Sequence, residues 1–125
     1  MTWRAVDLTE FFDGDNSPPQ PTIGSVRGTS LGLFYPGRVN QVFGPSGAGK
    51  TWFVLAVIAE YLMLNMTCVL VDHEDQPTGT ISRLTALGVS PDQILENLIY
   101  VQPEERWSKK AEEQLKDSLG EKKPV

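Results

Sequence analysis

The stretch from Gly44 to Thr51 constrains this chain more than any other part of its sequence. It fills the pattern G-x-x-x-x-G-K-[S/T], with a strand-like segment, 38–43, before it and an apolar run of helical length, 52–64, after it. Because a phosphate-binding loop must lie between a strand and a helix, this context supports the motif, and it argues against a glycine-rich turn that only joins the two. The sequence therefore predicts a chain that binds a nucleoside triphosphate.

The residue types of the loop explain how it would hold phosphate. Glycines let the backbone curl so that successive N–H groups point at an anion, and the following helix N-terminus adds partial positive charge. Lys50 is expected to reach the β- and γ-phosphates, and Thr51 offers a hydroxyl to Mg²⁺. The predicted cofactors are thus ATP and Mg²⁺. The predicted binding residues are Gly44, Pro45, Ser46, Gly47, Ala48, Gly49, Lys50, Thr51 and Trp52.

Composition limits the other functions that the chain can have. With 125 residues, 40% hydrophobic content and a formal charge of -5, it reads as one soluble domain at most. A single cysteine, Cys68, excludes an internal disulfide framework and a multi-cysteine metal site. No signal peptide or membrane-length apolar run is visible, so a cytoplasmic location is expected. Residues 37–103 carry more acidic than basic side chains, so DNA contact is expected only elsewhere or in an assembly.

The pattern along the chain predicts an α/β fold. Residues 1–30 are rich in turn formers and read as an extended N-terminal segment, and 31–125 as a partial nucleotide-binding domain. Strands are expected over 38–43, 67–71 and 97–101, with helices over 50–64, from Pro77 to Gly88 with Asp75 as its cap, and from Trp107 to Gly120. This alternation favours a parallel sheet with right-handed crossovers in a three-layer αβα arrangement.

Short-range patterns add detail to these helices. The helix over 50–64 is apolar nearly all round, as expected of one buried between layers, and Asn65 is expected to close it in the left-handed conformation. In the next helix Ile81, Leu84 and Leu87 are expected to face the sheet. The stretch from Ser90 to Gln93 is a capping box that starts a short helix. In the last helix one apolar stripe and an ion pair of Glu112 with Lys116 are expected, the stripe being Trp107, Ala111, Leu115 and Leu119.

A second acidic site follows the middle strand. Asp72-His73-Glu74-Asp75 comes directly after the apolar run 67–71. Because ligands collect beyond the carboxyl ends of parallel strands, this site and the loop are expected to open on the same edge. A carboxylate here would then lie within reach of the γ-phosphate or of its attacking water. His73 has no ligand partners at metal spacing, so an orienting or bystander role is favoured.

The chain resembles the RecA-like ATPases, specifically the RepA-type hexameric helicases of phages and mobile elements. The resemblance runs from about residue 30 to the C-terminus and is carried by 35–40, the loop with Thr51-Trp52, 71–75, Arg83-Leu84, 86–88 and 98–105. It implies that Glu74 polarises the attacking water with Asp75 beside it, so the catalytic set is Glu74 and Lys50. It also implies hexamer formation and a parent helicase in phage or plasmid DNA replication.

The resemblance covers only the first half of such a motor. The family's core continues into a strand that ends in the Walker B aspartate, and none is visible after residue 101. The chain is therefore expected to be truncated before that strand, to be completed by a longer ATPase partner, or to be a vestige with a different use. Since a missing arginine finger alone costs about 10³–10⁵ in rate, ATP binding is expected with hydrolysis weak or absent.

Alternatives stay open for the acidic residues and for the function. Asp72 is assigned to the metal site together with Thr51, and would orient Mg²⁺ as the aspartate of a Walker B element does in small P-loop kinases. Glu74 would, in the simplest alternative, be a helix-capping or solvated carboxylate. The competing functions are a non-enzymatic ATP-binding module that docks on and regulates an intact ATPase, and a small-molecule P-loop kinase.

Overall fold

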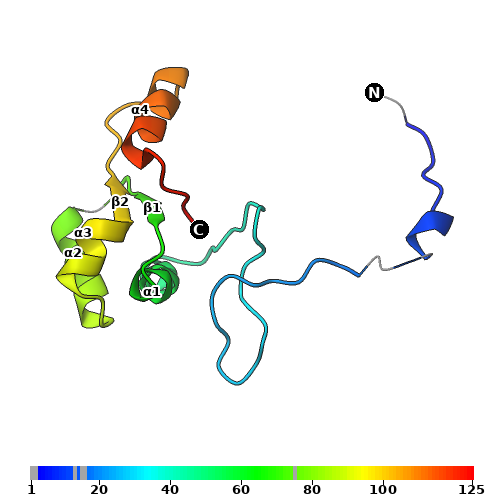
Figure 1. The fold of residues 1–125 in the computed structure, drawn as a ribbon, viewed down its shortest axis with the longest axis horizontal. Coiled ribbons are helices and arrows are strands. Elements are labelled where there is room, and N and C mark those ends of the chain that lie inside the picture. Colours follow the sequence, from blue (N-terminus) through cyan, green and yellow to red (C-terminus); the bar gives the residue numbers. More distant parts are fainter. Residues whose placement is uncertain (1–2, 13, 15–16, 75) are drawn as a thin grey trace. The chain divides into compact units, whose positions relative to one another are not determined.

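The computed structural model describes residues 3–12, 14, 17–74 and 76–125, and its contacts divide the chain into two compact units (Figure 1). The first unit is Met1–Asn40 and the second is Gln41–Val125. The division falls inside the segment 38–43. The whole phosphate-binding loop therefore belongs to the second unit, which also holds both strands of the sheet.

Two parallel strands form the sheet of the second unit. β1 (Cys68–Val71) pairs with β2 (Leu98–Val101) in a register that places Cys68 opposite Leu98 and Val71 opposite Val101. Parallel neighbours need a crossover connection, which here contains α2 (Pro77–Ala86) and α3 (Pro91–Asn97). The α/β class is confirmed at this level, together with two of the predicted strands. The three-layer arrangement and the truncation stay predictions.

The strand predicted over residues 38–43 is wrong. The structure assigns neither helix nor strand to this segment, and Val39 and Phe43 are exposed. A strand forms only where a neighbour takes up its backbone hydrogen bonds, and the sheet of the described residues consists of β1 and β2, without this segment. In the second unit the order is thus helix, strand, helix, helix, strand, helix, rather than the strand-first alternation that the sequence predicts.

The helix behind the loop, α1 (Lys50–Met63), is confirmed and ends one residue earlier than predicted. Leu55, Ala59 and Leu62 are buried, and their spacing places them on one side of the helix. The prediction that this helix is buried nearly all round is wrong, because Trp52, Phe53 and Met63 are exposed. α1 therefore packs with a single apolar stripe.

Short-range capping signals set several of the helix ends. Asn65 adopts the predicted left-handed backbone just after α1, with φ 59°. Gly88, with φ 100°, follows α2, as predicted. At the start of α3, Ser90 Oγ accepts the Gln93 N–H at 3.2 Å, and Gln93 Oε1 accepts the Ser90 N–H at 3.1 Å. This reciprocal pair is the predicted capping box.

α2 begins at Pro77, as predicted, with Gln76 in the position before it. Asp75, predicted as the cap of this helix, lies outside the described residues. Leu84 is fully buried, whereas Ile81, which the sequence also places toward the sheet, is 47% exposed. The helix thus contributes a narrower apolar stripe than its sequence predicts.

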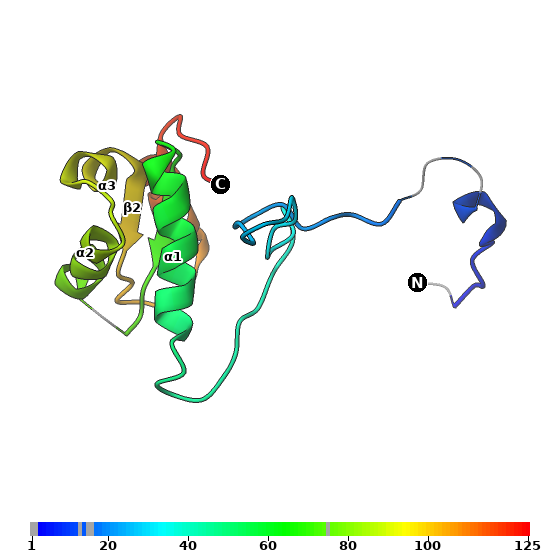
Figure 2. The ribbon, with the colours of Figure 1, turned by 90° about the horizontal axis from the view of Figure 1, so that it is seen from below.

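The core of the second unit is a small apolar cluster to which α1, α2, α3 and β1 contribute side chains. Figure 2 shows how α1, α2, α3 and β2 lie together. Leu55, Leu62 and Leu84 are each at most 2% exposed. Full burial of one such side chain is worth about 1.5–3 kcal/mol, so these leucines carry much of the stability of the unit. The buried members of the cluster are Leu55, Ala59, Leu62, Cys68, Leu84, Val89 and Ile94.

Burial in this core raises the pKa of the Cys68 thiol. The folded chain therefore keeps the thiol proton at pH values where the unfolded chain, with an ordinary thiol pKa of about 8.5, has begun to lose it. Stability from this group is full below about pH 8.5 and falls as the pH rises through the raised value. We expect slow alkylation of Cys68 by iodoacetamide in the folded chain at pH 8, and rapid alkylation in denaturant.

The control for this prediction is Cys68→Ala in urea titrations at neutral and alkaline pH. The wild type is expected to lose more stability than the variant between the two pH values, because only the wild type carries the thiol. Equal alkylation rates in the folded and unfolded chains would contradict the burial of Cys68.

The last predicted helix, α4 (Lys109–Leu119), is confirmed, but none of its side chains reaches the buried core. Ser108 Oγ accepts the Ala111 N–H at 3.2 Å, and the predicted pair of Glu112 and Lys116 joins at 2.7 Å. Trp107, predicted as the first member of the apolar stripe of this helix, lies before it and is 68% exposed. No residue of α4 is buried. This helix therefore adds little to the core.

The first unit has little regular structure among its described residues. A short helix, η1 (Thr9–Phe11), is preceded by Asp7, whose carboxylate accepts the Thr9 N–H at 3.0 Å, and this hydrogen bond lowers the pKa of Asp7. Further along, Ile23 and Phe34 form an antiparallel bridge. Across the described part of both units, none of the helices has the length and apolar composition that crossing a bilayer requires.

Candidate functional site

The backbone of the loop adopts conformations that only glycine takes without strain. Gly47 has φ 80° and Gly49 has φ 91°, both in the left-handed region. Between them the chain turns, with the Ala48 N–H donating to the Pro45 carbonyl at 3.2 Å. Residues 44–49 are exposed, so the N–H groups of the loop are open to a ligand from solvent. The glycines of the motif thus stand where the turn requires them.

The side chain of Lys50 forms hydrogen bonds to the backbone at the start of the loop. Its Nζ donates to the Gly44 carbonyl at 2.6 Å and to the Pro45 carbonyl at 3.0 Å. Two carbonyl oxygens satisfy an ammonium only in part, since Lys carries three N–H donors. The positive charge therefore lies beside the Gly44 and Pro45 carbonyls with capacity for a further acceptor, which the predicted role of Lys50 requires.

Asp72 is fixed at the carboxyl end of β1. Its backbone N–H donates to the Val101 carbonyl at 2.9 Å, which extends the β1–β2 pairing by one residue. Its Oδ1 accepts the Glu74 N–H at 3.0 Å, and its Oδ2 accepts the Tyr100 hydroxyl at 2.9 Å. These two hydrogen bonds orient the Asp72 carboxylate, whose oxygens can each accept more than one hydrogen bond or a metal ion.

A cavity of about 230 Å³ joins these groups. Lys50 and Thr51 line it from the start of α1, and Asp72 lines it from the end of β1. The prediction that the loop and the end of the middle strand open on the same edge is therefore confirmed for Asp72. The remaining lining residues are Val42, Val54, Leu55, Leu70, Val71 and Thr80.

Glu74 lies differently from Asp72. Among the described residues, those lining this cavity do not include Glu74, whose side chain is exposed. Its neighbour Asp75, predicted as the second acid, lies outside the described residues. The backbone N–H of Glu74 is therefore held by Asp72, but the Glu74 carboxylate, which is the predicted catalytic group, does not line the cavity.

The residues present fit a magnesium-bound phosphate group. Mg²⁺ takes oxygen ligands, and the Thr51 hydroxyl and the Asp72 carboxylate are oxygen donors on one cavity. The left-handed glycines and the Lys50 ammonium supply the anion-binding side. Ligand sites for whole small molecules usually measure about 300–1,000 Å³. This cavity therefore suits the phosphate end of a nucleotide, with the sugar and base outside it.

Trp52 stands apart from the cavity. Its ring lies 5.9 Å from the guanidinium carbon of Arg83 on α2, in a cation–π arrangement, and its side chain is 47% exposed. This contact links α1 to α2 on the surface. Whether Trp52 contacts nucleotide, as the sequence predicts, stays a prediction.

Sequence reasoning missed two residues of the site. Tyr100 holds Asp72, and only the parallel register, with Leu70 opposite Tyr100, brings the two side chains together. Thr80 lines the cavity and is 2% exposed. Its position four residues before the buried Leu84 places both on one side of α2, and this spacing is the sequence signal that could have identified it.

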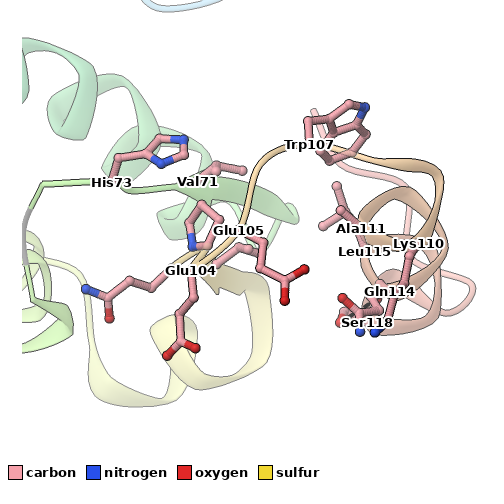
Figure 3. A pocket seen from close by; sticks show the side chains of 13 residues that line it. Val71, His73, Glu104, Glu105, Trp107, Lys110, Ala111, Gln114, Leu115 and Ser118 are labelled. Atoms are coloured by element: carbon pink, nitrogen blue, oxygen red, sulfur yellow. Dashed lines mark hydrogen bonds between the residues drawn. The ribbon is translucent and has the colours of Figure 1, made fainter.

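A second, larger cavity of about 410 Å³ lies between the carboxyl ends of the strands and α4 (Figure 3). His73 and Val71 line it from the end of β1, and Glu104 and Glu105 from the segment after β2. Lys110, Gln114 and Leu115 line it from α4. No group of three or more His, Cys, Asp or Glu side chains that could hold a metal ion is found among the described residues.

Comparison with known proteins gives partial similarities to RecA. The chain is 38% identical over 82 residues to Protein RecA of Desulfovibrio desulfuricans, covering 64% of this chain and 22% of that protein. It is 36% identical over 59 residues to Protein RecA of Deinococcus radiodurans, covering 47% of this chain and 16% of that one. It is 40% identical over 68 residues to DNA repair protein recA homolog 3, mitochondrial, of Arabidopsis thaliana, covering 54% and 14% respectively.

These similarities cover a small part of each relative. The chain spans only 14% to 22% of the length of these three proteins. No family model matches it. No solved structure matches it either. The similarities support a RecA-like P-loop ATPase region, and they do not single out the RepA-type helicases.

Proposed function

We propose that this chain binds Mg·ATP through the loop Gly44–Thr51, as the nucleotide-binding region of a RecA-like ATPase. One observation carries the proposal. The Lys50 ammonium, the Thr51 hydroxyl and the Asp72 carboxylate, which come from two separate elements, line a single cavity at the carboxyl end of β1. The Lys50 ammonium can bind phosphate, and the oxygens of Thr51 and Asp72 can bind Mg²⁺, so the cavity suits a triphosphate with its magnesium ion.

Each residue has a specific role in this proposal. The backbone N–H groups of the loop, except at Pro45, which has none, hold phosphate oxygens, and Lys50 directs its ammonium to the β- and γ-phosphates. Thr51 supplies a ligand to Mg²⁺, and Asp72, oriented by Tyr100, holds the metal directly or through a water molecule. Trp52 completes the predicted nucleotide-binding set. The bound Mg²⁺ neutralises phosphate charge, while the protein groups position the triphosphate.

Glu74 is proposed as the group that polarises the attacking water, with Lys50 stabilising charge on the transferred phosphate. In the chain alone hydrolysis is expected to be weak or absent. The exposed position of Glu74, outside the cavity wall, supports this expectation, because a general base must come within about 2.6–3.2 Å of the proton it takes, or act through one water.

The prediction for Glu74→Gln separates binding from hydrolysis. The amide keeps the size of the side chain and removes its basicity, so affinity for Mg·ATP is expected to change less than about twofold. Any residual phosphate release is expected to fall by about 10²–10⁴, which is the usual contribution of a general base. Affinity is measured by calorimetry, and hydrolysis by phosphate release under single-turnover conditions.

The matched control is Glu60→Gln, an acid-to-amide change on α1 away from the cavity wall. It is expected to leave both quantities unchanged. Loss of ATP binding in Glu74→Gln would contradict the role proposed for this carboxylate, because a water-polarising residue does not hold the ground-state nucleotide.

The parent activity is a further part of the proposal. The sequence resemblance to the RepA-type group motivates a hexameric helicase in phage or plasmid DNA replication, located in the cytoplasm. The Arabidopsis relative is named a DNA repair protein, which motivates repair as the alternative setting. DNA contact is assigned to an assembly, because residues 37–103 lack a basic stripe.

Two other functions use the same site. A regulatory module would bind Mg·ATP without hydrolysing it and would copurify with a longer ATPase. A small-molecule P-loop kinase would use Asp72 for Mg²⁺, and would form ADP only when an acceptor is added. The position of Asp72 on the cavity is compatible with the kinase, so ADP formation with and without acceptors is the measurement that separates the two.

Equilibrium dialysis of the full chain with labelled ATP tests the proposal. We expect saturable binding of one ATP per chain that weakens when Mg²⁺ is removed by EDTA, because Thr51 and Asp72 act on the nucleotide through the metal. Labelled adenosine is expected to bind far more weakly, since the cavity suits the phosphates. Equal binding of adenosine and ATP would overturn the assignment of the loop.

A further inference from the structure

Thr80 carries a hydroxyl that is buried and has no hydrogen-bond partner among the described residues. The residue lies near the start of α2, and its side chain is only 2% exposed. Its backbone N–H donates to the Gln76 carbonyl at 3.4 Å, but its Oγ1 makes no hydrogen bond with any described residue. Most buried polar side-chain atoms in native proteins have a partner, and an unpaired one costs stability. This hydroxyl therefore indicates a partner that the described residues do not supply.

The Thr80 side chain lines the same cavity as the groups of the nucleotide site. This is the 230 Å³ cavity that it shares with Lys50, Thr51 and Asp72. Among the described residues, Asn97 Nδ2 is the unpartnered side-chain atom that is closed off from solvent, whereas Thr80 Oγ1 is not closed off. A ligand group that enters the cavity can therefore reach the Thr80 hydroxyl.

The composition of the cavity wall indicates which ligand group this hydroxyl fits. Apart from Lys50, Thr51, Asp72 and Thr80, every residue that lines the cavity is apolar. Lys50 and Asp72 already have hydrogen-bond partners, and in the proposed function Thr51 and Asp72 supply oxygens to Mg²⁺. A threonine hydroxyl has one proton to donate. Phosphate oxygens are the acceptors that Mg·ATP would bring here, and hydrogen bonds to such charged acceptors are strong.

We propose that Thr80 binds the triphosphate directly, its hydroxyl donating a hydrogen bond to a phosphate oxygen. The inference rests on the proposed function, because it needs Mg·ATP in the cavity, and it adds a residue that the loop motif does not contain. Lys50 and Thr51 hold the nucleotide from α1, and Asp72 holds it from the end of β1. Thr80 adds α2 to these elements. Its role is to bind and position phosphate rather than to transfer a proton.

Calorimetric titration of the full chain with Mg·ATP tests this role in Thr80→Val and Thr80→Ser. Valine keeps the branched shape and removes the hydroxyl, whereas serine keeps the hydroxyl and removes a methyl group. The dissociation constant of Thr80→Val is expected to rise at least about tenfold, because a hydrogen bond to a charged group is lost. Thr80→Ser is expected to stay within about threefold of the wild type, since the donor remains. Wild-type affinity in Thr80→Val would overturn the proposal.

Thermal unfolding of the same variants without nucleotide separates binding from a structural role. Thr80→Val is expected to melt at or above the wild-type temperature, because it replaces an unpaired buried hydroxyl with an apolar group of the same shape. Thr80→Ser is expected to melt lower, because it loses a buried methyl group. The two variants thus change affinity and stability in opposite orders. A Thr80→Val that melts well below the wild type would show that the hydroxyl has an internal partner, and would overturn the proposal.

The wild type and Lys50→Ala keep this proposal apart from the proposed function. Equal affinity of these two chains for Mg·ATP would reject the nucleotide site, and the role of Thr80 with it. Strong binding by the wild type, weak binding by Lys50→Ala and unchanged binding by Thr80→Val would reject the role of Thr80 alone.

Hydrogen exchange of the wild type keeps the test decisive if Thr80→Val does not fold. The Gly79 and Thr80 amides, both bonded to the Gln76 carbonyl, are expected to exchange more slowly with Mg·ATP, because the nucleotide then holds the start of α2. The Glu112 amide, bonded to the Ser108 carbonyl at α4, is the comparison and is expected to change little. Mg·ATP binding with unchanged exchange at Gly79 and Thr80 would overturn the proposal.

Discussion

Lys50→Ala is expected to weaken Mg·ATP binding by about 100-fold or more. The substitution removes the one ammonium that lies inside the loop, bonded to the Gly44 and Pro45 carbonyls. Hydrogen bonds to charged groups are each worth about 1.5–3 kcal/mol, and Lys50 is predicted to contact two phosphates. The fold is expected to survive, because Lys50 contributes nothing to the buried apolar cluster.

Lys116→Ala is the matched control for this prediction. Lys116 lies on α4 in an exposed pair with Glu112, and such surface pairs contribute about 0–1 kcal/mol. Calorimetric titration with Mg·ATP is expected to give wild-type affinity for Lys116→Ala. Similar affinity in Lys50→Ala and the wild type would show that the loop does not bind the triphosphate.

Leu84→Ala is expected to destabilise the second unit by about 2–5 kcal/mol. Leu84 is fully buried on α2, in the cluster that joins this helix to α1. Removing a buried leucine side chain loses its transfer free energy and leaves a cavity, and the two together give this range. Urea unfolding followed by far-UV circular dichroism measures the change in the free energy of unfolding.

Leu95→Ala provides the comparison for the core. Leu95 lies on α3 and is 81% exposed, so the same chemical change there is expected to alter stability by less than about 0.5 kcal/mol. A loss of stability in Leu84→Ala no larger than in Leu95→Ala would contradict the packing of α2 against α1.

Local signals in the sequence predicted local structure well. The capping box of Ser90 and Gln93, the left-handed Asn65 and the ion pair of Glu112 with Lys116 each depend on residues a few positions apart. The same holds for α1, whose start is set by Gly49 and whose length follows its apolar run. Such features need no knowledge of distant neighbours.

Features that depend on partners were predicted less well. Residues 38–43 have a strand-like sequence, but they do not join the sheet of the described residues, which consists of β1 and β2, so they form no strand there. Trp107 fits the apolar spacing of the last helix, yet α4 begins after it and Trp107 is exposed. In both cases the side-chain pattern is present, and the packing partner that would use it is not found in the described part of the chain.

The candidate site shows the same contrast. The motif predicted the residues of the loop as phosphate ligands. The position of Asp72 at the end of the middle strand predicted a place in the same site, and Asp72 does line the cavity with Lys50 and Thr51. The hydroxyl of Tyr100 on Asp72 depends on the register of β1 with β2, which no short-range pattern encodes. The role given to Glu74 rests on resemblance and stays a prediction.

The melting temperature of the full chain against Mg·ATP concentration tests the central claim most directly. A ligand that binds only the folded state at about 100 times its dissociation constant adds about 2.7 kcal/mol, which raises the melting temperature by several degrees. We predict this rise for the wild type and its absence in Lys50→Ala, with both melting at the same temperature without nucleotide. An unchanged wild type, or an equal rise in both chains, would contradict a functional triphosphate site in the loop Gly44–Thr51.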